Sequence, residues 1–93
     1  MVLEVVILNI KEGLSEEFEQ SFAVASTIIS SMKGYISHQL KKCVEIENQF
    51  ILMVKWETLE DHEIGFRKSP QYLEWKELLH HFYNPFPEVL HYR

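Results

Sequence analysis

Side chains that could do chemistry gather in the last third of this sequence. They are His62, Phe66, Arg67, Tyr72, Trp75, His80, His81 and Tyr83. A histidine, with an ordinary pKa of about 6.5, suits a general base, and an arginine stays charged and can stabilise an oxyanion. Aromatic side chains exclude water and stack on planar molecules. The segment therefore predicts an aromatic-walled pocket with a few directed polar groups.

We predict His62 as the general base, because it shares the inner side of a short helix with Phe66. His38, on a strand face with apolar neighbours, is the next candidate, and Arg67 is the predicted partner of the substrate anion. The alternative is structural: His62 is then a satisfied core residue, and Arg67 forms a surface ion pair with Glu63, four residues before it.

The predicted pocket wall consists of large rings and a second histidine. The predicted substrate-binding residues are Trp56, Phe66, Tyr72, Trp75, His81 and Tyr83. For Trp75 and for Phe82, each taken individually, a place in the core is the favoured interpretation. His80 and His81 diverge by about 100° on a helix, so they do not share one ligand, and at least one of them is expected to be structural.

The sequence lacks the patterns that hold a metal or a cofactor. It has no His-x-x-x-His or His-Glu-x-x-His spacing and a single cysteine, Cys43. Its three glycines are too far apart to form a phosphate loop. We therefore predict no metal, flavin or haem.

Charge and length limit the partners further. The net charge is −5 over 93 residues, with only two arginines, so nucleic acid and anionic membrane are poor partners. No apolar run approaches the roughly 20 residues of a membrane span, and the amino terminus lacks the basic region of a signal peptide. The sequence predicts one cytoplasmic domain over residues 1–93.

Hydrophobic periodicity predicts four strands and two helical regions. The expected strands are Val2–Ile10, Tyr35–Glu45, Phe50–Trp56 and Phe86–Tyr92. The expected first helix is capped by Ser15, buries residues up to Met32 and stops at Gly34. Thr58 caps a short second helix, which breaks and restarts at Ser69-Pro70.

This order of elements predicts a ferredoxin-like α+β domain, β-α-β-β-α-β, with an antiparallel sheet in the order 4-1-3-2. Both central strands, 2–10 and 50–56, are apolar on both sides. Both helices cover one face of such a sheet, which leaves an apolar face in water. A second copy of the chain, packed sheet against sheet, is the economical cover, so we predict a homodimer.

Three stretches carry a family resemblance: ILNIKEG (residues 7–13), MKGYISHQL (32–40) and FILMVKWETLEDHEIGFRKSPQY (50–72). The last has the pattern strand, Trp-Glu, helix, Ser-Pro. Together they resemble the antibiotic biosynthesis monooxygenase family of dimeric α/β barrels, over essentially the whole chain. The resemblance implies a dimeric α+β barrel and a small monooxygenase that oxidises phenols or quinols with oxygen, without metal or flavin.

The family also contains haem-degrading members, which use an Asn, a Trp and a His. The matching positions here hold Val6, Phe66 and Lys76, which disfavours haem degradation. Many members carry a His shortly before the Ser-Pro pair, where this chain has Phe66, with His62 one turn earlier. The predicted function is oxidation of a small electron-rich aromatic molecule. The alternatives are a non-catalytic ligand-binding or stress-associated protein and a small-molecule isomerase on the same fold.

Overall fold

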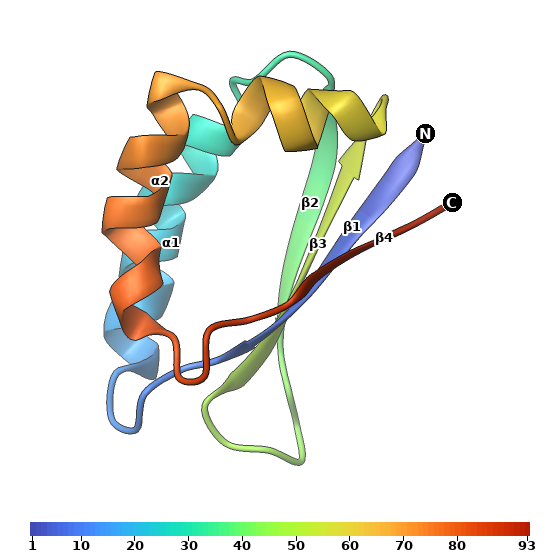
Figure 1. Ribbon diagram of the computed structural model, residues 1–93. Coiled ribbons are helices and arrows are strands. Elements are labelled where there is room, and N and C mark those ends of the chain that lie inside the picture. The colour runs from blue at the N-terminus through green and yellow to red at the C-terminus, as the bar shows by residue number, and fades with distance from the viewer.

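The computed structural model describes residues 1–93 and forms a four-stranded antiparallel sheet with two helices on one face (Figure 1). The elements are β1 (Val2–Asn9), α1 (Ser15–Ile29), β2 (Tyr35–Lys42), β3 (Gln49–Trp56), a π-helical turn η1 (Asp61–Phe66), α2 (Pro70–Leu79), a 3-10 turn η2 (His80–Phe82) and β4 (Val89–Tyr92). The strand order β2-β3-β1-β4 confirms the predicted ferredoxin-like topology.

Strand register decides which side chains face the helices. β1 pairs with β3 from Val2 opposite Trp56 to Asn9 opposite Gln49, and with β4 so that Glu4 lies opposite His91. Because side chains alternate along a strand, every second residue of β1 starting at Val2 points inward. Glu4 belongs to this inward set, which is otherwise apolar.

The helices cover the inner face with aromatic and aliphatic side chains. α1 buries Phe18, Phe22, Ala25 and Ile29, the stripe that the sequence predicts. α2 buries Trp75 and Leu79. One cluster of 16 buried hydrophobic residues joins both helices to β1 and β3, so the site described below rests on a continuous core.

The ends of several elements differ from the predicted ones. Leu14, not Ser15, precedes the first turn of α1, and the Ser15 hydroxyl instead donates to Asn48 Oδ1 at 2.6 Å. α1 ends at Ile29, because the next backbone bonds, from Ser31 N–H to the Ile28 carbonyl and from Met32 N–H to the Ile29 carbonyl, span three residues instead of four. β2 ends at Lys42, where the turn into β3 begins.

The end of the chain also departs from the prediction. β4 begins at Val89 rather than Phe86, because Pro85 and Pro87 have no N–H to donate to a neighbouring strand. The predicted second helix breaks at Ser69 as expected, and its last turn tightens to the 3-10 turn η2.

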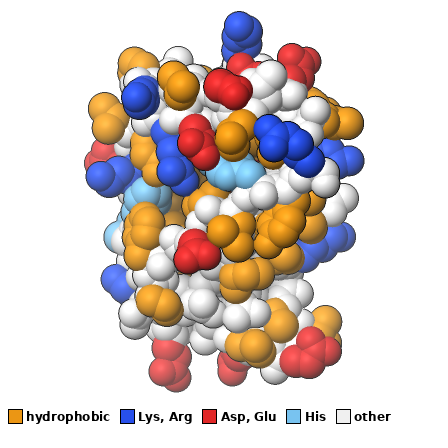
Figure 2. All heavy atoms as spheres, turned by 45° about the vertical axis from the view of Figure 1, so that its right-hand side comes forward, with side chains coloured by type: hydrophobic (Ala, Val, Ile, Leu, Met, Phe, Trp, Pro, Cys, Tyr) orange, Lys and Arg blue, Asp and Glu red, His pale blue; other side chains and the backbone are white.

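The outer face of the sheet carries no helix. Ile7, Leu90 and Tyr92 are 43%, 46% and 52% exposed there, and hydrophobic side chains gather in patches on the surface shown in Figure 2. The structure contains one chain, so the homodimer expected from this face remains a prediction. No helix is long and apolar enough to cross a membrane.

Candidate active site

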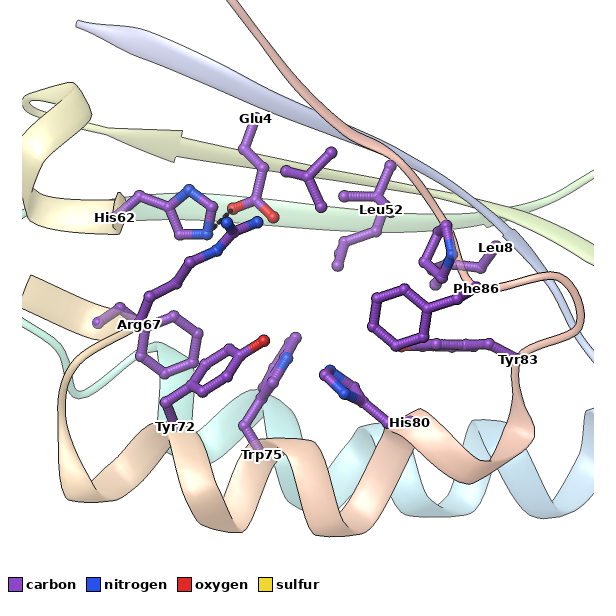
Figure 3. Close-up of a pocket in the computed structure, with 14 residues that line it drawn as sticks. Glu4, Leu8, Leu52, His62, Arg67, Tyr72, Trp75, His80, Tyr83 and Phe86 are labelled. Atoms are coloured by element: carbon purple, nitrogen blue, oxygen red, sulfur yellow. Dashed lines mark ion pairs between the residues drawn. The ribbon is translucent and has the colours of Figure 1, made fainter. Parts of the chain in front are cut away.

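A cavity lies between α2 and the inner face of the sheet, with η1 at one end and the segment before β4 at the other (Figure 3). Val6, Leu8 and Leu52 form its floor. The enclosed part of the cavity is about 60 Å³. Ligand pockets usually hold roughly 300–1,000 Å³, so a bound aromatic molecule would extend from this enclosed part into the open mouth.

Glu4 supplies the polar end of the cavity. The residue is only 5% exposed. Its Oε1 atom accepts a hydrogen bond of 2.9 Å from Trp56 Nε1 and lies 3.4 Å from His62 Nε2. Figure 3 shows the carboxyl group facing the cavity, with His62 and Arg67 beside it. No hydrogen bond within the chain uses Oε2, which leaves that atom free for a bound molecule.

Burial moves the pKa values of Glu4 and His62 in opposite directions. It raises the pKa of Glu4 from 4.5 to about 7, although the Trp56 hydrogen bond and the Arg67 charge oppose the shift. Burial, followed by the charges of Arg67 and His91, lowers the pKa of His62 from 6.5 to about 3. At neutral pH, His62 is therefore uncharged and Glu4 lies near its titration midpoint.

The far end of the cavity is aromatic. His80 packs edge-on against Phe86 at 4.9 Å between ring centroids, and Tyr83 lies 5.7 Å from His80. Burial lowers the pKa of His80 and raises that of Tyr83. The imidazole is therefore uncharged and the phenol protonated at neutral pH. In Figure 3 the side chains of Tyr72, His80 and Phe86 point into the cavity.

A single serine fixes the junction between η1 and α2. Ser69 Oγ donates to the Phe66 carbonyl at 2.6 Å and accepts from the Tyr72 N–H at 3.2 Å. Pro70, with no N–H to satisfy, occupies the first helical position. This cap sets the angle between the two segments, so that Phe66 and Tyr72 meet edge to face at 5.3 Å.

The comparison with known proteins decides the family. The family model described as antibiotic biosynthesis monooxygenase matches residues 1–78. The chain belongs to this family. It is also 58% identical over 93 residues to the uncharacterized protein YczJ of Bacillus subtilis (strain 168), a match that covers all of this chain and 98% of YczJ.

Solved structures agree with the antibiotic biosynthesis monooxygenase fold. A Bordetella bronchiseptica protein that carries the same family name superposes with a TM-score of 0.94 at 26% identity, over 99% of this chain and 94% of that one. SnoaB of Streptomyces nogalater, described as a cofactor-independent oxygenase, superposes with a TM-score of 0.82 at 20% identity, over 99% and 90%. At 20% identity, SnoaB supports the shared fold alone.

In this family member, six of the predicted site residues line the cavity. They are His62, Phe66, Arg67, Tyr72, Trp75 and Tyr83. Trp75 is also buried in the core, so this residue belongs both to the core and to the cavity wall. The structure thus brings together the aromatic and polar groups that the sequence places in η1 and α2.

The other three predicted residues do not line the cavity. Trp56 is 0% exposed and lies behind Glu4 and His62, stacked on the His62 ring at 5.3 Å. His38 lies on β2, where its Nδ1 pairs with the Tyr35 hydroxyl. His81 is exposed on η2, because the 3-10 turn directs His80 inward in its place.

Eight of the 14 lining residues were not among the predicted site residues; the polar or aromatic ones are Glu4, His80 and Phe86. A signal existed for Glu4, since it is the only charged residue of β1 and shares the parity of Val2 and Val6. The inward turn of His80 depends on the local 3-10 geometry, which has no comparable sequence signal. No cluster of three or more His, Cys, Asp or Glu residues is arranged to hold a metal ion.

Proposed function

We propose that this protein is a cofactor-independent monooxygenase that oxidises a small electron-rich aromatic molecule, of the phenol or quinol type, with O₂. One observation carries the proposal: the buried carboxyl of Glu4, with a pKa of about 7, faces a cavity walled by aromatic rings. The family name and the description of SnoaB as a cofactor-independent oxygenase agree with this chemistry.

Glu4, rather than His62, takes the role of the base in this proposal. A general base works best when its pKa lies near the working pH. The pKa of Glu4 is about 7, whereas that of His62 is about 3, which makes the imidazole a weak acceptor. The Glu4 carboxylate accepts the hydroxyl proton of the substrate, and His62 holds the carboxyl in place.

The substrate anion needs a positive partner once its proton is lost. Arg67 lines the cavity beside Glu4 and supplies a guanidinium group there. The Tyr83 phenol stays protonated, because burial raises its pKa, so it can donate a hydrogen bond. In a cavity with few water molecules these donors stabilise an oxyanion more strongly than bulk solvent does.

The deprotonated aromatic molecule then supplies the electrons for oxygen. It transfers one electron to O₂, and the resulting radical pair combines to a peroxide anion at a ring carbon. Glu4 returns one proton to this anion, which gives the hydroperoxide. Loss of water from the hydroperoxide leaves a carbonyl at that carbon. For a phenol the sum is phenol plus O₂ giving quinone plus water. One oxygen atom enters the product, the other leaves in water, and both electron pairs come from the substrate.

Oxygen uptake with a panel of phenols, naphthols and hydroquinones tests the proposal. We expect uptake above the uncatalysed rate for at least one compound, with one atom of ¹⁸O₂ in the product. Glu4→Gln should lower kcat by about 10²–10⁴-fold without unfolding the protein. The exposed Glu60→Gln is the matched control and should leave the rate unchanged.

Other outcomes separate the alternatives. Saturable binding of these compounds without oxygen uptake would favour a ligand-binding protein. Conversion of a ketone or lactone to an isomer, again without uptake, would favour an isomerase. Full activity in the Glu4→Gln variant would contradict the assignment of the base.

A further inference from the structure

Four titratable side chains form a continuous line from the cavity to the surface. Glu4 Oε1 lies 3.4 Å from His62 Nε2. The other nitrogen of the same ring, His62 Nδ1, lies 2.8 Å from His91 Nε2. His91 Nδ1 then lies 3.7 Å from Glu63 Oε1. The Glu63 side chain is 47% exposed, so the line ends in solvent.

The fold itself builds this line. In the β1–β4 pairing, His91 lies directly opposite Glu4, so both side chains point to the inner side of the sheet. η1 supplies His62, which points inward, and its neighbour Glu63, which points outward. Two elements that are far apart in the sequence thus place two imidazole rings between one buried and one exposed carboxyl.

We propose that the His62–His91 pair is a proton exit, through which a proton taken up by Glu4 leaves the cavity for solvent beside Glu63. The source of that proton rests on the function proposed above, in which Glu4 deprotonates the substrate. The exit is a separate property of the chain and is tested separately below.

Such an exit serves the reaction because it lets Glu4 exchange the substrate's proton with solvent while the cavity is filled. The carboxyl is 5% exposed, and its accessible side faces the cavity. An aromatic molecule bound between Tyr72 and Phe86 separates that side from bulk water. The back of the carboxyl is closed by Trp56, which is fully buried. The imidazole of His62 is the titratable group that remains within reach.

The transfer is balanced by three coupled hops. Protonated Glu4 gives its proton to His62 Nε2 while His62 Nδ1 gives its own proton to His91 Nε2. His91 Nδ1 then releases its proton to Glu63 or to water. One proton enters the line and one leaves, no ring gains a net charge, and both imidazoles change tautomer. The reverse shift restores both first tautomers and returns one proton from solvent to Glu4, which passes it to the peroxide anion formed from the substrate, so the cycle closes with no net proton released.

The surroundings of the two rings favour transfer without a charged intermediate. Burial disfavours imidazolium at both His62 and His91. Glu63 opposes this effect at His91, and Arg67 acts in the same direction as burial at both rings. Trp56 stacks on His62 at 5.3 Å with an angle of 21° between the planes. This contact holds the ring with one nitrogen toward Glu4 and the other toward His91.

A measurement without turnover tests the exit directly, with the cavity filled by a non-ionisable aromatic molecule such as anisole. The ¹³C signal of the Glu4 carboxyl, followed through its titration, reports how fast the group exchanges its proton with solvent. We expect slower exchange, seen as a broader signal near the midpoint, in His91→Phe and in His91→Gln, which keeps a polar group but cannot pass a proton on. Unchanged line shapes in a folded variant would overturn the proposal.

Turnover supplies the second test, once a substrate is found. We expect either His91 variant to lower kcat by about tenfold or more at low buffer concentration and to leave KM unchanged. This loss is smaller than the loss expected when the base itself is removed. Added imidazole at millimolar concentration should restore kcat, whereas a purely structural defect would not respond. Glu63→Gln should show a smaller loss than His91→Gln, and Glu60→Gln none. A kcat that imidazole does not restore would overturn the exit.

The two proposals fail in different ways. If no compound supports oxygen uptake but the carboxyl exchange slows in the His91 variants, the exit stands and the function does not. If uptake is found and the His91 variants retain wild-type exchange and kcat, the function stands and the exit does not.

Discussion

Glu4 and His62 occupy the same buried environment, and burial disfavours the charged form of both. The consequence for a carboxyl is a raised pKa, and for an imidazole a lowered one. At neutral pH the pair therefore consists of an uncharged imidazole beside a carboxyl group that can gain or lose a proton. This division of roles is the residue-scale basis of the proposed base and of its proton exit.

The same shifts predict how stability depends on pH. In the unfolded chain Glu4 loses its proton near pH 4.5, but in the folded protein only near 7. Its ionisation therefore lowers the free energy of unfolding as the pH rises from 4.5 to 7. His62 acts oppositely: its neutral folded form is favoured above pH 6.5, and that stability is lost as the pH falls toward 3.

Glu4→Gln should isolate the carboxyl contribution. The variant keeps an oxygen that can accept the Trp56 hydrogen bond but cannot ionise. We expect its free energy of unfolding, relative to wild type, to grow by on the order of 3 kcal/mol between pH 4.5 and 7 and to stay level above that. Urea unfolding across this pH range measures it. A difference that does not change with pH would contradict the raised pKa.

Sequence reasoning reached the aromatic wall more easily than the base. The helical spacing of Tyr72 and Trp75 predicts that both lie on one buried face of a helix, because such spacing is a direct sign of burial. The reactivity of Glu4 depends instead on what surrounds it, and its neighbours Trp56 and His62 are more than 50 residues away in the sequence. A pKa shift produced by distant contacts leaves only a weak local signal, here a lone charge within an apolar strand.

At the scale of elements, the broken second helical region determines the shape of the cavity. η1 and α2 meet at an angle, so that η1 supplies His62 at the polar end, Arg67 follows directly after it, and α2 supplies Tyr72 at the wall. The Ser69-Pro70 pair predicted this break from the sequence, because cap chemistry is local. The inward turn of His80 depends on the packing of η2 and was not predicted.

Ser69→Ala tests how far the cap controls the site. It removes the hydroxyl that bonds both the Phe66 carbonyl and the Tyr72 N–H. We expect a loss of about 1 kcal/mol in unfolding free energy, together with a raised KM because the two aromatic walls move apart. Ser26→Ala, a half-buried serine inside α1 whose hydroxyl bonds only the Ala23 carbonyl, is the control and should leave KM unchanged. A KM equal to wild type in Ser69→Ala would show that core packing alone positions these walls.

At the scale of the whole molecule, the two faces of the sheet are covered unequally. Helices cover the inner face of the sheet, and the outer face presents Val5 and Met53 side by side at its centre, with Leu90 on the other side of Val5. Exposed apolar area of this kind favours association. We propose that a second copy of the chain covers this outer face, as predicted from the apolar residues on both sides of the central strands.

Val5→Lys tests this assembly. The substitution places a charge at the centre of the outer face, where burial in an interface would leave it without a partner and cost several kcal/mol. We expect sedimentation equilibrium at micromolar concentration to give twice 11.1 kDa for the wild type and 11.1 kDa for the variant. Val24→Lys, on the exposed side of α1, is the matched control and should remain a dimer. Because the cavity lies on the opposite face of the sheet, a Val5→Lys monomer that keeps its fold should still bind the aromatic substrate. A monomeric wild type would show that this apolar face stays exposed to water.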